Sequence, residues 1–535
     1  MSAEAGGFRS RSRSGESPRL ADKSGNQTGK KTDARGAKSQ QHDKRRPHSH
    51  KQQKRQKRTH RETAGVDKPR LLAFAVLNRV SDDDAYANLI LPKCLREERV
   101  KGRDAAFATE ITYGCLRSLG VLDTVIDACS SRELDSLATP VLNALRLGTY
   151  QLLFTRVDDH AAVDTSVRLV ESAEHGKAKG FVNGILRTVG RTPREQWIAQ
   201  LRPEGELAGL AFEHAHPEWI ARSFNEALLA ENQDASLGVE SPRSDGIHPE
   251  LAAALAADSE RPLVHLVARP GEISAEELAL MIGGETGRYS PYAVYLESGG
   301  NPGALEPVQQ SMAAVQDEGS QLIARAVVEA EVLGEDSGRW LDLCAGPGGK
   351  AALLGALAAI DGASVDAVEV SPHRAELIRS TVADLPVTVH VADGRSPGLA
   401  AGFDRVLVDA PCSGLGALRR RPEARWKKDD SDILDLNTLQ VELLRSALQL
   451  VRPGGVVVYS TCSPDLRETR SIVDTILGDT DGPAVEELSA LATLPDIPGI
   501  GVPGIGTGNF ISAQMWPHRH GTDAMFFAVL RRKIT

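Results

Sequence analysis

From about residue 310 onward, short apolar runs alternate with stretches of helical periodicity, and this alternation constrains the fold more than any other feature. The apolar runs cover residues 340–343, 364–370, 387–391, 404–409, 455–460 and 525–531. Strands that alternate with helices are typical of βαβ units, in which parallel strands lie between two layers of helices. We therefore expect an α/β fold with a doubly wound, mainly parallel sheet in this part of the chain.

A glycine-rich segment, CAGPGGK at residues 344–350, follows the first expected strand. Its spacing is not that of a phosphate-binding P-loop, but its glycines let backbone approach a ligand closely at the start of a helix. Glu369 ends the second expected strand and Asp393 follows the third. A carboxylate about twenty residues after a glycine loop is placed to bind ribose hydroxyls. The series predicts an adenosyl cofactor; the alternative, a dinucleotide oxidoreductase, lacks a visible second nucleotide-binding half.

Two cysteines follow two further expected strands. Cys412 lies in the motif DAPC after the apolar residues 406–408, and Cys462 lies in STCS after residues 456–459. Ligands of open α/β sheets bind at the carboxyl ends of the strands. Two thiols at this edge, beside a cofactor loop, indicate covalent catalysis on a bound base. The alternative is that both are buried structural cysteines.

The rest of the chain divides by pattern. Apolar residues of 67–205 recur at three- and four-residue spacing and predict a helical bundle. Residues 206–310 predict linker helices and a small α+β domain, with strands at 263–268 and 292–296 around a helix that a capping box at 274–277 opens. Residues 311–535 form the α/β part, and residues 1–66 a disordered basic arm.

Charge is divided unevenly between the arm and the body. Residues 1–66 hold 18 Lys and Arg against 6 Asp and Glu, a net of +12, so the remainder carries −21 of the overall −9. An arm with so few apolar residues cannot fold alone, and basic arms bind polyanions by neutralising phosphates. The alternative is a solvated tail without a partner. On the acidic body we expect one local basic patch for RNA, residues 419–422 and 425–428, which includes Trp426.

Other features exclude several classes. None of the six cysteines forms a CxxC pair, so we expect neither a zinc site nor a disulfide framework, and a reduced, cytoplasmic setting. His518 and His520 have no further ligands near them in sequence, which favours a packing or RNA-contacting loop over a metal site. We expect no membrane span, because no run of about 18 uncharged apolar residues occurs, and no secretory signal.

Three motifs in this order, LDLCAGPGGK, VLVDAPCSGLG and YSTCS, resemble the RNA cytosine-C5 methyltransferase family that uses S-adenosylmethionine. The resemblance extends from VQDEGSQ at residue 315 to the C-terminus and includes the closing run at 515–523. Residues 67–200, notably HAAVD at 160–164, are similar to the NusB-type RNA-binding helical domain. The combination resembles the Sun/Fmu (RsmB) branch, which modifies 16S ribosomal RNA. It implies a Rossmann-like S-adenosylmethionine-dependent methyltransferase domain preceded by an all-α NusB-like domain and the small α+β domain.

The resemblance also implies roles for individual residues. Cys462 would be the nucleophile that adds to cytosine C6, Cys412 would help remove the C5 proton and release the product, and Asp409 would bind the N3 and N4 edge of the base. Glu369 would bind the cofactor ribose and Asp393 would lie near the adenine. The implied cofactor contacts are Cys344, Ala345, Gly346, Pro347, Gly348, Gly349, Lys350, Glu369, Asp393 and Asp409. Cys344 is expected to pack under the cofactor loop without reacting.

Two positions depart from the family pattern: Gly346 stands where alanine is common, a mild change, and Thr469 follows Glu468 where asparagine is frequent, so Thr469 receives no role. Three alternatives stay open: a transfer-RNA cytosine methyltransferase, a DNA methyltransferase, and a non-catalytic RNA-binding ribosome assembly factor. DNA enzymes place their nucleophile in the Pro-Cys motif and lack the Thr-Cys cysteine, so Cys462 favours RNA. We expect a monomer.

Overall fold

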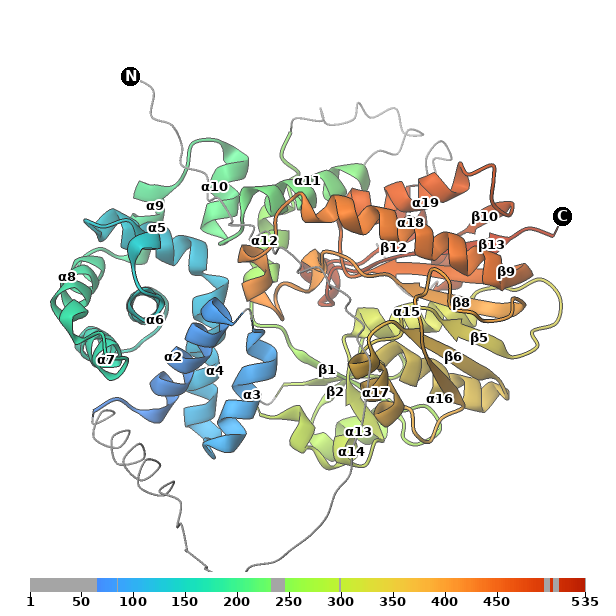
Figure 1. Cartoon of the computed structure of the whole chain (residues 1–535), viewed down its shortest axis with the longest axis horizontal. Coiled ribbons are helices and arrows are strands. Elements are labelled where there is room, and N and C mark those ends of the chain that lie inside the picture. Colours follow the sequence, from blue (N-terminus) through green and yellow to red (C-terminus); the bar gives the residue numbers. More distant parts are fainter. Residues whose placement is uncertain are drawn as a thin grey trace, which may run out of the picture. The chain divides into compact units, whose positions relative to one another are not determined.

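The computed structural model describes residues 65–83, 85–231, 246–297, 300–494, 501–503 and 510–534 (Figure 1). All but the last two residues of the predicted basic arm, 1–66, lie outside this range. Among the described helices, none combines the length and apolar character that crossing a bilayer requires.

The predicted helical bundle is confirmed (Figure 1). Asp67 caps its first helix, with its side chain accepting a hydrogen bond from Arg70 N, and Asp158 caps α7 in the same way. Buried side chains from different helices, including Leu77, Ile111 and Leu122, form its core. The helices are α2 Lys68–Asp82, α3 Ala87–Glu97, α4 Gly102–Arg117, α5 Leu119–Cys129, α6 Thr139–Phe154, α7 Asp159–Ser172, α8 Lys179–Val189 and α9 Arg194–Leu201.

Three helices and a small sheet follow the bundle. The helices are α10 Glu206–Glu213, α11 Glu218–Glu231 and α12 Leu251–Ser259. The antiparallel sheet has the order β2-β3-β1-β4, and the predicted capping box opens the helix beside it. Its elements are β1 Val264–Ala268, α13 Ala275–Ile282, β2 Glu285–Thr286, β3 Ala293–Leu296, α14 Glu306–Gln309 and β4 Ala313–Val315. Since β4 pairs with β1, this sheet extends past residue 310; the four-part division of the chain stays a prediction.

The predicted α/β fold is confirmed, with all six expected strands present. The parallel part of the large sheet has the order β9-β8-β5-β6-β7. These strands are β5 Arg339–Asp342, β6 Ser364–Glu369, β7 Val387–Val391, β8 Phe403–Asp409 and β9 Val451–Thr461. The sixth expected strand is β13 Phe526–Arg532, which pairs antiparallel with β9. The sequence pattern did not predict the three other strands that extend this side of the sheet by antiparallel pairing, β10 Val485–Leu488, β11 Gly501–Pro503 and β12 Phe510–Gln514.

Helices cover both faces of the parallel strands (Figure 1). Leu407 of β8 packs with α15 and α16, whereas its neighbours Val406 and Val408 pack with α18 on the opposite face. A strand buried on both faces reads as a continuous apolar run, which is why these strands were predictable. The remaining helices are α15 Glu318–Glu329, α16 Gly349–Asp361, α17 Pro372–Thr381, α18 Asp432–Leu450, α19 Arg470–Leu477, α20 Ala490–Thr493 and α21 Pro517–His520, with 3-10 turns η4 Leu415–Ala417, η5 Pro422–Trp426 and η6 Leu466–Glu468.

Candidate active site

The topological switch point of the parallel sheet lies between β5 and β8. From β5 the chain continues to β6 and β7 on one side, whereas β8 and β9 lie on the other. Strand β5 ends at Asp342, β6 at Glu369 and β8 at Asp409, with Asp409 in register with Ser460 of β9. Ligands bind at such a point because the connections diverge there and leave the strand ends accessible.

The predicted cofactor loop, residues 344–350, crosses this edge between β5 and α16. Ala345 N donates to Val368 O over 2.9 Å, which anchors the loop to β6. Gly348 caps α16 with φ +114°, a conformation that favours glycine. A Cβ on the exposed Gly349 would meet nothing closer than the Gln316 amide at 3.9 Å, so ligand atoms can approach this backbone.

Gly346, which stands where alanine is common in the family, is more closely packed than Gly349. A Cβ there would lie 2.0 Å from Glu369 Oε2 and 2.6 Å from Arg374 Nη2. Arg374 Nη2 also donates to Gly346 O over 2.5 Å. An alanine at this position therefore requires the ends of two side chains to move, one of which is the predicted ribose ligand.

The two carboxylates predicted to bind the adenosyl group are both at strand ends. Glu369 is buried; its Oε1 accepts from Ser371 N over 2.8 Å, and Arg374 Nη2 lies 3.5 Å from its Oε2. Asp393 is more exposed and accepts from the Arg395 guanidinium at 2.6 Å, a hydrogen bond that lowers the pKa of Asp393. Asp393 would therefore have to share its carboxylate between Arg395 and an adenine.

Asp342 is a site residue that the sequence analysis missed. It is fully buried at the end of β5, and neither carboxylate oxygen has a partner among the described residues. Burial raises the pKa of Asp342 to about 7, with a further contribution from the Asp409 carboxylate. The only signal in the sequence was an acidic residue ending an apolar strand. An unpartnered carboxylate, an open glycine backbone and a ribose acid together fit a ligand that carries an ammonium group and hydroxyls, as S-adenosylmethionine does.

Asp409 lies between the cofactor loop and the cysteine motifs. Lys350 Nζ donates to its Oδ2 over 2.8 Å, and Ser460 Oγ donates to its Oδ1 over 3.1 Å. Burial opposes the charge on Lys350, but the adjacent Asp409 carboxylate raises the pKa of Lys350. The predicted base-binding acid is thus held as one member of an ion pair.

The structure brings the two predicted catalytic cysteines together. Cys412 Sγ and Cys462 Sγ are 3.4 Å apart. The hydrogen bond with Cys412 lowers the pKa of Cys462 against the effect of burial, and the charges of Lys350 and Arg421 lower it further. The same hydrogen bond, together with burial, raises the pKa of Cys412 well above its ordinary value. Cys462 is therefore the better thiolate and Cys412 the better proton carrier.

Cys344 lies apart from this pair in its chemistry. It packs against the core beneath the cofactor loop, and burial raises the pKa of its thiol well above its ordinary value. A thiol held protonated is a poor nucleophile, which agrees with the packing role expected for Cys344.

The predicted RNA-binding patch is wrong for Arg419, Arg425 and Trp426. Arg425 is fully buried and its Nη2 donates to Asp258 Oδ2 over 2.8 Å. Arg419 is also buried and donates to Asp523 Oδ1 over 2.7 Å, while Trp426 Nε1 donates to Leu116 O over 3.1 Å. These side chains bind other parts of the protein instead of phosphates or a base.

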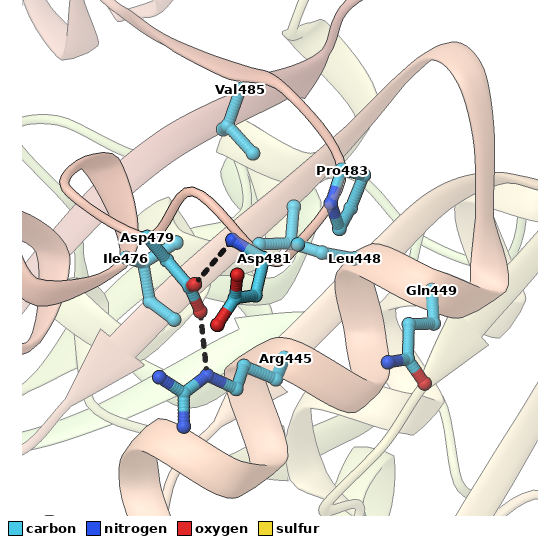
Figure 2. A pocket seen from close by; sticks show the side chains of 9 residues that line it. Arg445, Leu448, Gln449, Ile476, Asp479, Asp481, Pro483 and Val485 are labelled. Atoms are coloured by element: carbon cyan, nitrogen blue, oxygen red, sulfur yellow. Dashed lines mark hydrogen bonds and ion pairs between the residues drawn. The ribbon is translucent and has the colours of Figure 1, made fainter.

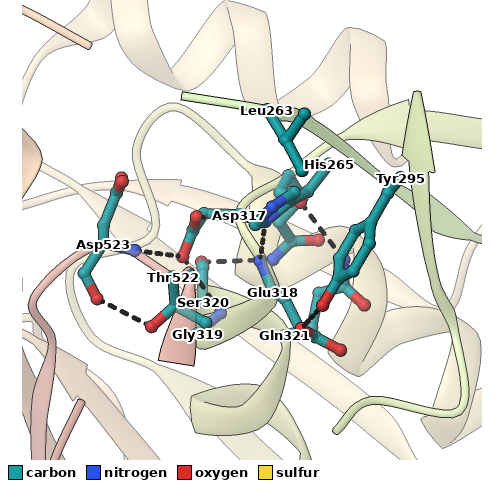
Figure 3. Close-up of polar contacts among 12 residues, drawn as sticks. Leu263, His265, Tyr295, Asp317, Glu318, Gly319, Ser320, Gln321, Thr522 and Asp523 are labelled. Atoms are coloured by element: carbon teal, nitrogen blue, oxygen red, sulfur yellow. Dashed lines mark hydrogen bonds and ion pairs between the residues drawn. The ribbon is translucent and has the colours of Figure 1, made fainter. Parts of the chain in front are cut away.

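A polar network joins the small sheet to the start of α15 and to Asp523 (Figure 3). Asp317 Oδ1 accepts from Asp523 N over 3.1 Å, and its Oδ2 lies 3.3 Å from His265 Nδ1. Burial opposes the charge of Asp317, but His265 and the nearby Arg420 and Arg419 hold its pKa well below the usual range. Asp317, His265 and Asp523 of this network are buried.

The two histidines of the closing run pack within the protein. His518 Nε2 lies 2.9 Å from Glu250 Oε2, and Trp516 N donates to His520 Nδ1 over 2.9 Å. In the described part of the chain, no three His, Cys, Asp or Glu side chains gather as metal ligands would. Packing within the protein is one of the two roles expected for this loop.

A hollow of about 340 Å³ lies away from the cysteines, between α18, α19 and β10 (Figure 2). Arg445 Nε donates to Asp479 Oδ2 across it over 2.8 Å. None of the predicted catalytic or cofactor-binding residues lines this hollow.

The chain is similar in sequence and in fold to several known proteins. The 16S rRNA methyltransferase RsmB/F family model matches residues 332–531, and the NusB family model matches residues 67–191. "Putative methyltransferase Rv1407" of Mycobacterium tuberculosis is 51% identical over 470 residues, which cover 87% of this chain and 97% of that protein. "Ribosomal RNA small subunit methyltransferase B" of Salmonella heidelberg is 32% identical over 474 residues, or 86% of this chain and 98% of that protein. The crystal structure of PH0851 covers 87% of this chain and 99% of its own at a TM-score of 0.69 and 21% identity, a likeness of fold.

Proposed function

This chain belongs to the RsmB/F family of 16S ribosomal RNA methyltransferases, and we propose that it methylates C5 of a cytosine in 16S ribosomal RNA. The enzyme uses S-adenosylmethionine. The observation that carries the C5 proposal is the pair of thiols, 3.4 Å apart at the strand edge that also holds the cofactor loop. Neither an N-methylation nor a ribose methylation needs two cysteines.

Cytosine C5 is a weak nucleophile, so the reaction needs covalent activation of the ring. We assign this step to Cys462, whose lowered pKa favours the thiolate that adds to C6. The adduct makes C5 enamine-like and reactive toward the electrophilic methyl group that S-adenosylmethionine supplies when bound.

The other side chains bind and carry protons. Because its pKa is raised, Cys412 holds its own proton in the free enzyme. We assign it a part in removing the C5 proton, which it can accept once its own proton has passed to solvent; the electrons of the C5–H bond then expel Cys462 from C6. Asp409 would bind the N3 and N4 edge of the cytosine, while Lys350 donates to its Oδ2. Residues 344–350, Glu369, Asp393 and Asp409 are the proposed cofactor contacts. The target base must leave its stack to reach these groups.

We also propose a division of labour along the chain. Residues 67–205 would bind RNA, 206–310 would link, and 311–535 would carry the reaction, acting as a monomer. A cytoplasmic location follows from a ribosomal RNA substrate.

The test is a transfer assay with labelled S-adenosylmethionine and unmodified 16S RNA. We expect label as 5-methylcytosine with the wild type, loss of label in Cys462→Ala, and a covalent RNA complex that accumulates in Cys412→Ala. Cys129→Ala, which removes a partly exposed cysteine of α5, serves as the control and should transfer normally. Label at another atom, or undiminished transfer by Cys462→Ala, would refute the proposal.

A further inference from the structure

A buried carboxylate, Glu468, joins the loops that carry the two cysteines. It ends η6, six residues after Cys462, and is fully shielded from solvent. Its Oε1 accepts from Ser413 N over 2.7 Å and from Gln440 Nε2 over 3.2 Å, and its Oε2 accepts from the Ser413 hydroxyl. The arginines nearest to it in the chain pair with other carboxylates, Arg467 with Asp465 and Arg470 with Asp474.

These bonds hold the Cys412 loop from both sides. Ser413 directly follows Cys412 and is bound by Glu468. Pro411 directly precedes Cys412, and its carbonyl accepts from Gln440 Nε2 over 2.9 Å. Since Gln440 also donates to Glu468, the residues on either side of Cys412 are tied to one buried carboxylate.

The Cys462 side of the arrangement is anchored independently. Tyr459 of β9 donates its hydroxyl proton to Glu468 O over 2.7 Å, which fixes the turn that presents the carboxylate. Ser463 Oγ lies 3.2 Å from Ser413 Oγ, and Gly416 N donates to Cys462 O over 2.9 Å. The short distance between the two sulfur atoms follows from these contacts.

The two cysteines depend on Glu468 to different degrees. Cys462 directly follows Thr461, the last residue of β9, so the sheet itself holds it. Cys412 lies three residues beyond Asp409, where β8 ends, on a loop that Glu468 ties down. Removing the carboxylate therefore displaces Cys412 more than Cys462.

We propose that Glu468 is a positioning residue, which holds Cys412 against Cys462 so that product release follows formation of the adduct. The inference rests on the proposed function. A buried carboxylate without a cation is costly, and an apolar side chain would fill the same space at lower cost. The carboxylate instead supplies two acceptors for the Ser413 amide and hydroxyl, which an apolar side chain cannot replace.

The experiment uses the full-length chain with 16S RNA and S-adenosylmethionine, and compares the first turnover, the steady state and the covalent complex on denaturing gels. In Glu468→Ala we expect the first turnover to persist, steady-state turnover to fall about tenfold or more, and the complex to accumulate as in Cys412→Ala. The double variant Glu468→Ala/Cys412→Ala should accumulate as much covalent complex as Cys412→Ala alone, because both changes act through the Cys412 thiol.

Two variants separate positioning from stability. Glu468→Gln keeps an acceptor for the Ser413 amide, so release should recover and the complex should not accumulate. Glu423→Ala removes a different buried carboxylate, which accepts from Ala87 N over 2.8 Å, and should accumulate no complex. If Glu468→Ala loses activity without accumulating the complex while Cys412→Ala accumulates it, this inference is overturned and the proposed function stands. If Cys412→Ala and wild type show neither complex nor 5-methylcytosine, the proposed function fails and takes this inference with it.

Discussion

At the residue scale, the two neighbouring thiols have pKa values shifted in opposite directions. Cys462 and Cys412 form one hydrogen bond, and it lowers the pKa of the first while raising that of the second. The two groups therefore titrate as a coupled pair, with Cys462 losing its proton first. Two identical side chains can thus take the roles of nucleophile and proton carrier. The shared hydrogen bond favours the thiolate at Cys462, and the charges of Lys350 and Arg421 stabilise it further.

This arrangement predicts how Cys462 responds to loss of its neighbour. In Cys412→Ala the thiolate loses its hydrogen-bond donor, so the pKa of Cys462 rises and less thiolate is present at neutral pH. The pH dependence of iodoacetamide labelling, followed by mass spectrometry on the Cys462 peptide, measures this shift. Cys412→Ser keeps a donor and should shift the profile less. A profile that stays in place in Cys412→Ala would contradict the assignment.

A second residue-scale prediction concerns Asp342. Its pKa is about 7 in the folded protein and 3.8 as an ordinary Asp, so the folded state binds this proton more tightly than the unfolded state. Stability is therefore lost as the pH rises from about 4 to about 7. Asp342→Asn should raise the free energy of unfolding, by little at pH 4 and by on the order of 3 kcal/mol above pH 7. Denaturant unfolding across this pH range measures the gain.

The control for this measurement is Asp127→Asn, which changes an exposed carboxyl of α5. Its effect on the free energy of unfolding should not increase between pH 4 and pH 7. A gain for Asp342→Asn that shrinks as the pH rises would mean that the carboxyl is not buried as described.

At the element scale, η5 forms the main polar link between the α/β part and the helical bundle. Besides Arg425 and Trp426, Glu423 accepts from Ala87 N at the start of α3. The indole of Trp426 packs over Gly120 of α5, where a Cβ would lie 2.3 Å from its nearest ring atom. The segment that follows the Cys412 loop thus serves to join two parts of the chain.

This packing predicts opposite effects for two glycine substitutions. Gly184 of α8 has nothing within 4 Å of an added Cβ, so Gly184→Ala should stabilise by about 0.5–1 kcal/mol through helix propensity. Gly120→Ala forces Trp426 to move and should destabilise by about 1–3 kcal/mol. Thermal unfolding of both variants and the wild type measures the two changes: Tm should rise for Gly184→Ala and fall for Gly120→Ala. Equal shifts would show that Trp426 does not pack on Gly120.

The element scale also shows why some strands escaped prediction. Strands β5 to β9 are apolar runs because helices cover both of their faces. Strand β10, Val485–Leu488, contains Glu486 and Glu487 at its centre and pairs only with β13, so no apolar run marks it. Its partner β13 lies more than thirty residues later in the chain, so the local sequence of β10 does not show that the two pair.

At the scale of the whole molecule, the described body is acidic and the arm is basic. Within the described body, Arg419 and Arg425 of the predicted basic patch are buried in ion pairs. The +12 balance of residues 1–66 is therefore the strongest charge feature for binding RNA.

Deleting residues 1–60 should weaken RNA affinity and flatten its dependence on salt, because fewer counterions are released from RNA on binding. Fluorescence anisotropy with labelled RNA at several salt concentrations measures both effects. Replacing the lysines and arginines of residues 44–58 by glutamine removes charge but keeps the length of the arm. This variant should also bind RNA more weakly and with a flatter salt dependence. Unchanged affinity of the deletion variant at low salt would contradict this role.

The sequence alone determined the order of strands β5 to β9, the strand end that carries the predicted cofactor loop, and the convergence of Cys412 and Cys462 on one edge of the sheet. These follow from local periodicity and from the rule that parallel strands end at one edge, so neighbours in the chain suffice. Only the tertiary structure decided that Arg425 binds Asp258, 167 residues away, that Glu468 joins the cysteine loops, and that Asp342 is buried without a partner. Whether a charged side chain faces water or a buried partner depends on segments that are far apart in the chain. The local sequence pattern does not show which of these segments pack together.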